Sequence, residues 1–258
     1  MGERSHALVI IDPQNDFCDR KGSLYVDGAE DDIVRLAEHI EIFGGAYTGV
    51  FVSLDSHDAM AIFHPKFWTD ASRSNPAPYT AISASDFASG RWWPVRTVYA
   101  QHADRMFAAM EKKNIPSLMI WPEHCVVSTW GHGIAEPLAR ALASWREKTR
   151  VAVRYVFKGE NPYTEMFSIF EGIDDSWPDT AFNEDLYSRL AEFKTLTFAG
   201  EALSHCVEAS VTSYISRYAP LRQKICVMSD CTSCVPGFDR KASEERLSRL
   251  GVEFGLSR

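Results

Sequence analysis

The chain has 258 residues, a formal net charge of −8 and 45% hydrophobic residues, which is enough to bury one large core and ordinary for a globular protein. The negative charge argues against a nucleic-acid partner. No apolar run approaches membrane-spanning length and no signal peptide precedes the first strand-like run, so we expect no membrane partner and a cytoplasmic location.

Six short apolar runs, typical of buried parallel strands, alternate with segments of helical periodicity. The runs are residues 7–11, 49–54, 117–121, 151–157, 195–199 and 224–229. The helical segments are residues 31–43, 134–145, 185–193, 206–218 and 239–250. This alternation predicts an α/β fold, a three-layer α-β-α arrangement around a mostly parallel, Rossmann-like six-stranded sheet, as one domain over residues 1–258.

Residues 63–116 interrupt the alternation. The segment begins with a Pro/Ser/Ala-rich stretch, continues through Trp92 and Trp93, and shows a helical pattern at about residues 101–113. A connection of this length in a compact domain is usually a functional loop or a small subdomain. We therefore treat residues 63–116 as an insertion in the single domain.

Residues that carry chemistry follow the predicted strands. Ligands of open α/β sheets bind at the carboxyl ends of the strands, so side chains placed there are expected to converge. These ends supply an acid, Asp12, a cation, Lys158, and a thiol, Cys206. They also supply three residues that commonly bind metals: Asp55, His57 and His124. Each has a simpler explanation alone, because Asp12 could cap a turn, Lys158 could be solvated and Cys206 could be a buried apolar residue.

The position of Cys206 favours a reactive thiol, because the start of a helix after a strand stabilises a thiolate. Asp55, His57 and His124 are a carboxylate and two imidazoles, a set that suits zinc, iron or manganese. His64 is a candidate fourth ligand, although histidines are scattered through the chain. Cys231 and Cys234 form a CxxC without a second metal-binding pair, which favours two incidental thiols, and we expect all cysteines to be reduced.

Five segments in order along the chain resemble the nicotinamidase/pyrazinamidase branch of the isochorismatase-like cysteine hydrolases. They are IDPQNDF at 11–17, DSH at 55–57, WPEHCV at 121–126, FKGENPYTEMFSIF at 157–170 and GEALSHCVEAS at 200–210. The resemblance implies the isochorismatase-like hydrolase fold and an Asp–Lys–Cys catalytic triad, which these motifs place at Asp12, Lys158 and Cys206. It also implies a divalent metal, with zinc the first choice, on Asp55, His57 and His124.

In that family the metal binds the pyridine nitrogen of the substrate, and two aromatic positions that match Phe17 and Trp121 sandwich the ring. The resemblance further implies an oxyanion hole formed by the backbone N–H groups of Ala202 and Cys206. The peptide bond Glu201–Ala202 matches a cis bond of the family. The implied reaction is hydrolysis of nicotinamide to nicotinate and ammonia through a cysteine thioester.

Three other functions stay open. The chain could hydrolyse another small amide or C–N substrate, since its insertion is longer than the family pattern and Leu203 stands where Thr is frequent. It could bind a ligand without catalysis. It could also be a zinc-water hydrolase that uses Asp55, His57 and His124, with Cys206 structural.

The insertion carries a further expectation. Its start lies six residues after His57 and its end eight residues before His124, and nine large aromatic residues lie within it. Such apolar area is costly to leave in water, at roughly 25 cal/mol per Å². We therefore expect residues 63–116 to cover the active site and to contribute to a homo-oligomer interface.

Overall fold

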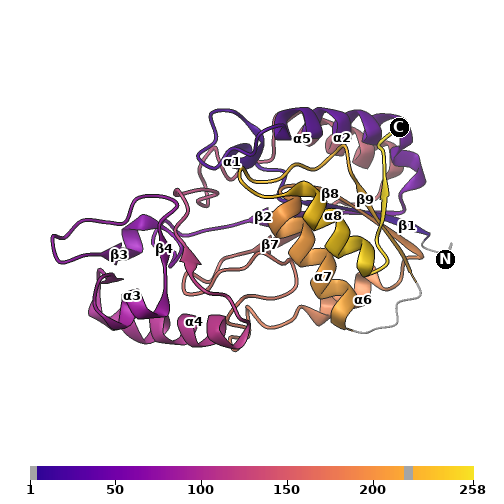
Figure 1. Cartoon of the computed structure of the whole chain (residues 1–258). Helices are drawn as coiled ribbons and strands as arrows, with labels where there is room; N and C mark the ends of the chain where they lie inside the picture. Colours follow the sequence, from indigo (N-terminus) through magenta and orange to yellow (C-terminus); the bar gives the residue numbers. More distant parts are fainter. Residues whose placement is uncertain (1–4, 218–222) are drawn as a thin grey trace.

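The computed structural model describes residues 5–217 and 223–258, and at its centre lies a six-stranded sheet (Figure 1). Every pair of neighbouring strands in this sheet is parallel. In spatial order the strands are β10 (Glu253–Gly255), β9 (Lys224–Met228), β8 (Thr195–Gly200), β1 (His6–Ile11), β2 (Gly49–Asp55) and β7 (Arg154–Lys158). The predicted α/β fold with a Rossmann-like six-stranded sheet is confirmed.

One predicted strand is wrong as a member of this sheet. The run at 117–121 forms only the two-residue strand β6 (Leu118–Met119), which pairs antiparallel with β4 (Ala81–Ile82) outside the main sheet. Pro116 and Pro122 bracket this run, and proline lacks the N–H that a central strand needs. The sixth strand is instead β10, whose three residues are too short to give a strand signal.

Helices cover both faces of the sheet, as the three-layer prediction requires (Figure 1). The helices α2 (Ala29–Phe43) and α5 (Glu136–Thr149) pack together on one face. The helices α6 (Glu184–Leu190), α7 (Glu208–Arg217) and α8 (Arg240–Arg249) lie on the other. The predicted end of α7 at residue 218 falls outside the described residues.

The strands are apolar throughout because both of their faces are buried. In β1, Leu8 and Ile10 pack in the cluster with α2 and α5, whereas Val9 and Ile11 pack in the cluster with α6 and α7. In α5 the buried residues recur with helical spacing, at Leu138, Ala141, Leu142 and Trp145. The two layers therefore bring the carboxyl ends of β1, β2, β7 and β8 to one edge of the sheet.

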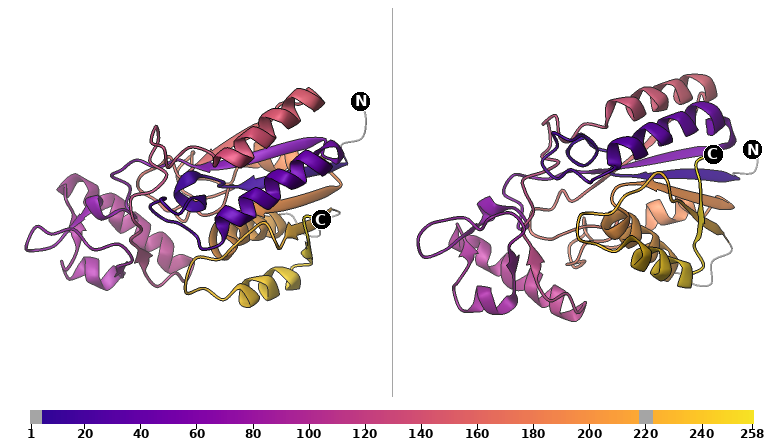
Figure 2. Two further views of the ribbon diagram at one scale, coloured as in Figure 1. Left: turned by 90° about the horizontal axis from the view of Figure 1, so that it is seen from above. Right: turned by 45° about the horizontal axis from the view of Figure 1, so that its top comes forward.

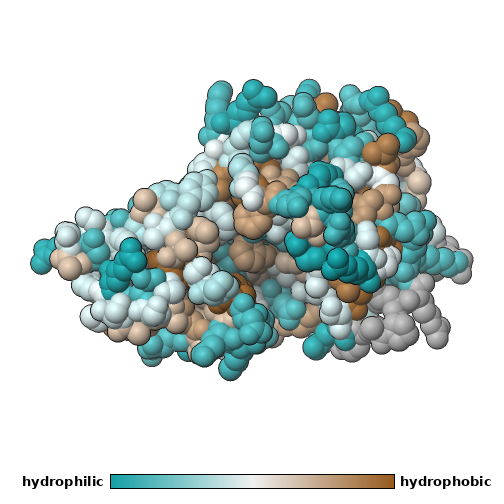
Figure 3. Space-filling view, viewed as in Figure 1, coloured by the Kyte–Doolittle hydropathy of each residue, from teal (hydrophilic) through white to brown (hydrophobic). Residues whose placement is uncertain are grey.

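Residues 63–116 form a lobe that projects beside the sheet in every view (Figures 1 and 2). It contains β4, the helices α3 (Ala84–Ala88) and α4 (Ala100–Lys112), and the antiparallel pair β3 (Trp68–Thr69) and β5 (Trp93–Pro94). The side chains of Phe63, Phe67 and Trp68 are fully buried. Apolar surface gathers in the hollow between this lobe and the sheet-bearing body (Figure 3).

Short helical segments complete the fold: α1 (Asn15–Cys18), η1 (Gly44–Ala46), η2 (Pro65–Phe67), η3 (Thr97–Tyr99) and the π-helical turn η4 (Leu203–Val207). No helix among the described residues has the length and apolar character required to cross a membrane.

Candidate active site

Lys158 is the centre of a buried charged cluster at the carboxyl edge of the sheet. Its Nζ donates hydrogen bonds to Asp55 Oδ1 at 2.8 Å and to the carbonyl oxygen of Met166 at 3.0 Å. Asp12 Oδ2 lies 3.0 Å from the same nitrogen, and Cys206 Sγ lies 3.7 Å away. The structure thus brings Asp12, Lys158 and Cys206 together from the ends of three different strands.

The local backbone holds Asp12 in this cluster. Asp12 has a positive φ of 42°, an uncommon conformation for a residue with a side chain. Its N–H donates to Ser53 Oγ at 3.0 Å, and that hydroxyl donates back to Asp12 Oδ1 at 2.6 Å. This reciprocal pair leaves Asp12 Oδ2 free to face Lys158, and an Asp12 carboxylate oxygen lies within 4.8 Å of Cys206 Sγ.

Burial sets the protonation of the cluster. It raises the pKa of Asp12, and Lys158 only partly offsets that effect. It would lower the pKa of Lys158, but the carboxylates of Asp12 and Asp55 outweigh it and hold that pKa well above its usual value. Burial also raises the pKa of the Cys206 thiol well above its ordinary range, against the opposing effect of Lys158.

Cys206 lies in the helical turn that follows β8, as the sequence indicated, but burial opposes the thiolate that this position was expected to favour. Cys206 is the fourth residue of the π-helical turn η4, and α7 begins only at Glu208. Because burial raises the pKa of Cys206, the neutral thiol is favoured over the thiolate. A base is then needed to remove the proton, and the Asp12 carboxylate, with an oxygen within 4.8 Å of Cys206 Sγ, is placed for that role.

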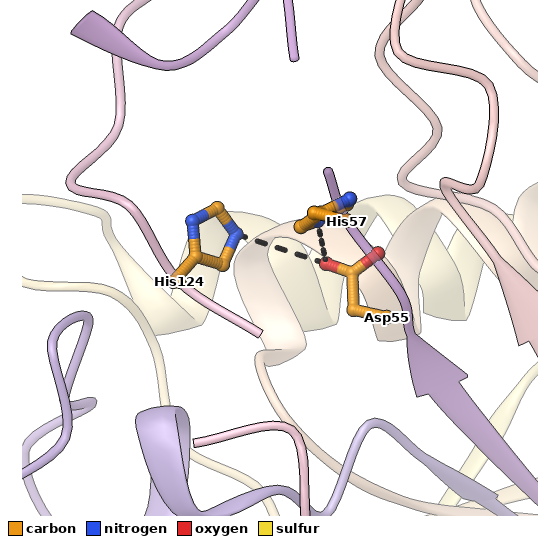
Figure 4. Close-up of side chains that lie close together, drawn as sticks. All are labelled: Asp55, His57 and His124. Carbon is orange, nitrogen blue, oxygen red and sulfur yellow. Dashed lines mark ion pairs between the residues drawn. The ribbon is translucent and has the colours of Figure 1, made fainter. Parts of the chain in front are cut away.

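Asp55, His57 and His124 form a second group beside the first (Figure 4). Asp55 Oδ2 lies 2.9 Å from His57 Nε2 and 3.8 Å from His124 Nε2. One ligand atom of each residue lies within 4.8 Å of the others, and all three side chains are buried. Carboxylate and imidazole atoms at this spacing are a donor set that a divalent cation such as zinc prefers.

The outer nitrogens of both imidazoles are occupied. His57 Nδ1 lies 3.1 Å from the carbonyl oxygen of Gly159, and His124 Nδ1 lies 2.8 Å from that of Pro122. A carbonyl can only accept, so each Nδ1 carries a proton and each Nε2 is the atom turned toward Asp55. Burial would lower the pKa of His57, but Asp55 raises it, and His57 Nε2 donates to the Asp55 carboxylate at 2.9 Å, a proton that a bound metal ion would replace. Burial, followed by the effect of His57, lowers the pKa of His124 to about 3, which keeps it in the neutral form that binds metals.

His64 lies outside this group. Its Nε2 is 3.3 Å from His124 Nδ1, the nitrogen turned away from Asp55, and its Nδ1 is 3.2 Å from the carbonyl oxygen of Asp58. The structure therefore places His64 behind His124, where it supports that ring.

Asp55 joins the two groups. Its Oδ1 accepts from Lys158 while its Oδ2 faces both histidines. Burial would raise the pKa of Asp55, but His57 and Lys158 together hold it far below the usual value, so the carboxylate stays ionised.

A pocket of about 420 Å³ opens onto both groups. Asp55, His124 and Cys206 form part of its wall, and the predicted ring-binding residues Phe17 and Trp121 line it too. Residues that the sequence analysis did not single out complete the wall: Leu24, Val26, Glu165, Phe167, His205 and Val235. No residue of 63–116 is among the described residues that line the pocket, so the expectation that this segment covers the active site is not met.

Glu165 and His205 are polar members of that wall. The side chain of Glu165 is only 5% exposed, and its Oε2 accepts from Trp121 Nε1 at 3.1 Å. Burial raises the pKa of Glu165 to about 7 and lowers the pKa of His205 to about 4. Glu165 lies in the segment 157–170 that carries the family resemblance, but a single carboxylate in a loop has no spacing pattern that would have marked it.

The proposed oxyanion-hole residues Ala202 and Cys206 both line the pocket. The peptide bond Glu201–Ala202 is cis, as the resemblance implied. In the described part of the chain, neither Ala202 nor Cys206 donates its N–H to a backbone carbonyl outside η4.

The loop that carries the CxxC supports this segment from behind. The carbonyl oxygen of Cys231 accepts from the N–H of Gly200 at 2.8 Å, and that of Ser233 accepts from the N–H of Leu203 at 2.7 Å. Cys231 and Cys234 are free thiols, and burial raises the pKa of Cys231 to about 12.

Comparison with known proteins extends over nearly the whole chain, although no family model matches it. The chain is 24% identical to the nicotinamidase of Saccharomyces cerevisiae over 241 residues, which cover 92% of this chain and 94% of that protein. The structure of the yeast nicotinamidase aligns with a TM-score of 0.69 at 19% identity, over 98% of this chain and 100% of the yeast chain. The chain has the nicotinamidase fold.

Two further structures support this assignment of the fold. An Acinetobacter baumannii nicotinamidase/pyrazinamidase aligns with a TM-score of 0.66 at 18% identity, covering 100% of this chain and 98% of the other. A Pyrococcus horikoshii pyrazinamidase in complex with zinc aligns with a TM-score of 0.59 at 17% identity, covering 98% and 99% of the two chains. The resemblance first drawn from five short motifs is confirmed at the level of whole sequence and fold.

Proposed function

We propose that this protein is a nicotinamidase, which hydrolyses nicotinamide to nicotinate and ammonia through a thioester on Cys206. One observation carries the proposal: Asp12, Lys158 and Cys206 meet at one end of a pocket with aromatic walls, next to a buried group of metal-ligand type. The similarity to the yeast nicotinamidase along nearly the full chain supports the same substrate.

In the first half of the reaction, the Asp12 carboxylate takes the proton of the Cys206 thiol and the sulfur attacks the carboxamide carbon. An amide is a poor electrophile, so dividing the task into acylation and deacylation lowers the barrier of each step. The protonated Asp12 then gives its proton to the departing nitrogen, and ammonia leaves. Proton transfer of this kind typically contributes about 10²–10⁴-fold.

Three residues stabilise the negative charge that develops. Lys158, held between Asp12 and Asp55, stabilises the carboxylate and the sulfur in their negative forms. The backbone N–H groups of Ala202 and Cys206 donate to the oxygen of the tetrahedral intermediate. Each such donor is worth about 3 kcal/mol in the transition state.

In the second half, Asp12 takes a proton from water, and the resulting hydroxide attacks the thioester carbonyl. The carbon–sulfur bond breaks, the proton returns to Cys206 and nicotinate is released. Asp12, Lys158 and Cys206 are then in their starting forms.

The ring is bound by the other end of the pocket. Phe17 and Trp121 hold its two faces. Asp55, His57 and His124 would hold a divalent ion, which would supply an electrophilic contact for the pyridine nitrogen. We take zinc as the first choice, with iron or manganese as alternatives. The proposal also includes a cytoplasmic homo-oligomer that acts in NAD salvage and pyridine nucleotide biosynthesis.

Replacement of the nucleophile tests the mechanism. Cys206→Ala should lower the rate of ammonia release from nicotinamide by at least about 10³-fold, and Cys206→Ser should be nearly as inactive, because a hydroxyl is a far weaker nucleophile at neutral pH. Cys226→Ala, on β9 and away from the pocket, is the matched control. Activity that survives in Cys206→Ala with bound zinc would instead support water attack promoted at Asp55, His57 and His124.

A further inference from the structure

Glu201, the residue before Ala202, is a buried carboxyl group that the proposed reaction does not use. Its side chain is 0% exposed. Its Oε2 accepts from the N–H of Ser233 at 3.1 Å, whereas its Oε1 has no hydrogen-bond partner within residues 5–217 and 223–258. A buried polar atom without a partner costs free energy, so the protonation of this carboxyl group has to account for it.

A second buried carboxyl group, that of Asp32 on α2, lies within hydrogen-bonding reach of Glu201. Both oxygens of Asp32 already accept hydrogen bonds, Oδ1 from Arg35 Nη2 and Oδ2 from the Ser233 hydroxyl. Asp32, which pairs with Arg35, is therefore the ionised member of the two. Two carboxyl groups bond to each other only through a proton, and the oxygen of Glu201 that has no donor is the atom that can carry it.

The surroundings of Glu201 favour its neutral form. Burial, followed by the charge of Asp32, holds the pKa of Glu201 well above its usual value, against smaller effects of Ser233 and Arg240. Arg240 of α8 does not neutralise Glu201, because its guanidinium donates to Glu244 and to two backbone carbonyl groups.

Two thiols also face Glu201. Cys18 is the last residue of α1, and Cys234 lies in the loop after β9. Burial raises the pKa of both thiols, so they are neutral at neutral pH. The charged groups near Glu201 are thus a carboxylate and a guanidinium already bonded elsewhere, and neither stabilises a second negative charge.

The backbone around Glu201 connects this carboxyl group to the oxyanion-hole segment. The N–H of Glu201 donates to the carbonyl oxygen of Ile11, the last residue of β1, at 2.8 Å. The carbonyl oxygen of Ser233 accepts from the N–H of Leu203 at 2.7 Å. Ala202 therefore lies between two residues that are each bonded to Ser233, one through its side chain and one through its backbone.

From this geometry we propose that Glu201 is a neutral carboxylic acid that donates a hydrogen bond to Asp32, and that this bond positions Ala202 for the oxyanion hole. The positioning role rests on the proposed function, whereas the location of the proton does not. The residues that line the described pocket do not include Glu201, which acts through Ala202 and is a positioning residue. The proton removes the repulsion between Glu201 and Asp32 and leaves Glu201 Oε2 free to hold the Ser233 loop.

Glu201→Gln tests where the proton lies, because a glutamine amide can donate to Asp32 and accept from Ser233 at any pH. The infrared difference spectrum between wild type and Glu201→Gln at neutral pH should contain the C=O stretch of a protonated carboxyl group, present in the wild type only. The matched control Glu245→Gln, an exposed change on α8, should remove only a carboxylate signal. A difference spectrum in which Glu201 contributes a carboxylate signal would overturn the proposal.

The pH dependence of stability is a second test of the same proton. A carboxyl group that stays protonated in the fold but ionises in the unfolded chain makes the fold less stable as the pH rises from its unfolded pKa toward its folded pKa. The unfolding equilibrium constant of the wild type, divided by that of Glu201→Gln, should therefore rise about tenfold per pH unit above about pH 5. Glu245→Gln should follow the wild type. A ratio for Glu201→Gln that is independent of pH would contradict the proposal.

Glu201→Ala tests the positioning role. Its kcat for nicotinamide should fall by at least about tenfold with KM within about twofold of the wild type, because an oxyanion hole acts on the transition state. Glu201→Gln should keep the wild-type kcat. In addition, the amide of Leu203 should exchange its hydrogen faster in Glu201→Ala than in Glu201→Gln, since the alanine variant loses the contact that holds Ser233.

A folded Glu201→Ala with the wild-type kcat and an unchanged exchange rate at Leu203 would overturn the positioning role, and so would an equal loss of kcat in both variants. If the wild type did not hydrolyse nicotinamide, the proposed function would fail. The infrared, unfolding and exchange measurements would still decide whether Glu201 carries the proton and holds this segment.

Discussion

Gln14 determines where the end of β2 lies. Its side-chain Nε2 donates to the carbonyl oxygen of Asp55 at 2.7 Å, and its Oε1 accepts from the N–H of Asp55 at 2.7 Å. The side-chain amide thus bonds to both backbone groups of the residue that contacts Lys158 and the two histidines. Gln14 touches none of the reacting atoms, and we regard it as a positioning residue.

Gln14→Ala should weaken metal binding by about 10–100-fold, the usual effect of losing a group that orients a ligand. Competition with a chromogenic zinc chelator measures this directly and does not require turnover. Asn15→Ala, which removes only a hydrogen bond to the carbonyl oxygen of Trp130, is the control and should bind zinc like the wild type. Wild-type zinc affinity in Gln14→Ala would show that Asp55 is held without it.

The protonation of Asp12 should set the acid limit of activity. Asp12 acts as a base only when ionised, and burial raises its pKa. Activity is therefore present above this raised pKa and is lost as the pH falls through it, at a higher pH than for an ordinary aspartate. The measurement is kcat/KM for ammonia release as a function of pH, with bound metal quantified at each pH. If activity declined only where metal is lost, the histidines and not Asp12 would set the limit.

The strands that carry the site follow patterns that a sequence can reveal, since β1, β2 and β8 are buried on both faces and therefore apolar throughout. The misplaced run at 117–121 is equally apolar, and what distinguishes it is the pair of flanking prolines and its pairing with β4 outside the main sheet. The pocket residues Glu165, Phe167 and His205 come from loops and from η4, which have no periodicity. Their convergence depends on contacts between segments distant in the sequence, which apolar patterns do not encode.

The insertion contacts residues of the pocket wall without itself lining the pocket. The ring of Tyr79 packs edge-on against Trp121, with centroids 6.2 Å apart, and the N–H of Tyr79 donates to the carbonyl oxygen of Ile120 at 2.5 Å. Phe63 and His64, at the start of the lobe, also contact residues that line the pocket, since the carbonyl oxygen of Phe63 accepts from the N–H of Trp121 and His64 lies against His124.

Tyr79→Ala should raise KM for nicotinamide by about 2–10-fold with little change in kcat. The reason is that an aromatic pair contributes roughly 0.5–1.5 kcal/mol, and its loss frees the Trp121 ring that holds the substrate. Steady-state kinetics of ammonia release provide the test, and Trp93→Ala at β5 is a control within the same lobe. Equal KM values for both variants and the wild type would leave the lobe without a role in substrate binding.

At the scale of the whole molecule, the proposed metal ligands come from two different parts of the fold. Asp55 and His57 follow a central strand of the main sheet, whereas His124 lies in the loop after β6, where the chain returns from the lobe. Asp16 is a second connection to this loop, because its Oδ2 accepts from the N–H of Cys125 at 2.7 Å. An ion bound at the three ligands would fix the start and the end of the insertion to the body of the protein.

Metal binding should therefore stabilise the whole fold. An ion present at about 100 times its dissociation constant adds about 2.7 kcal/mol to the free energy of unfolding, which corresponds to a rise in Tm of roughly 5–10 °C for a chain of this size. Calorimetry of the wild type with zinc and after chelation measures the shift. His124→Ala should show a much smaller difference between the two conditions, because it removes the ligand that belongs to the lobe side, while His132→Ala retains all three ligands and should respond like the wild type. Equal shifts in wild type and His124→Ala would place the stabilising ion elsewhere and would remove the metal from Asp55, His57 and His124.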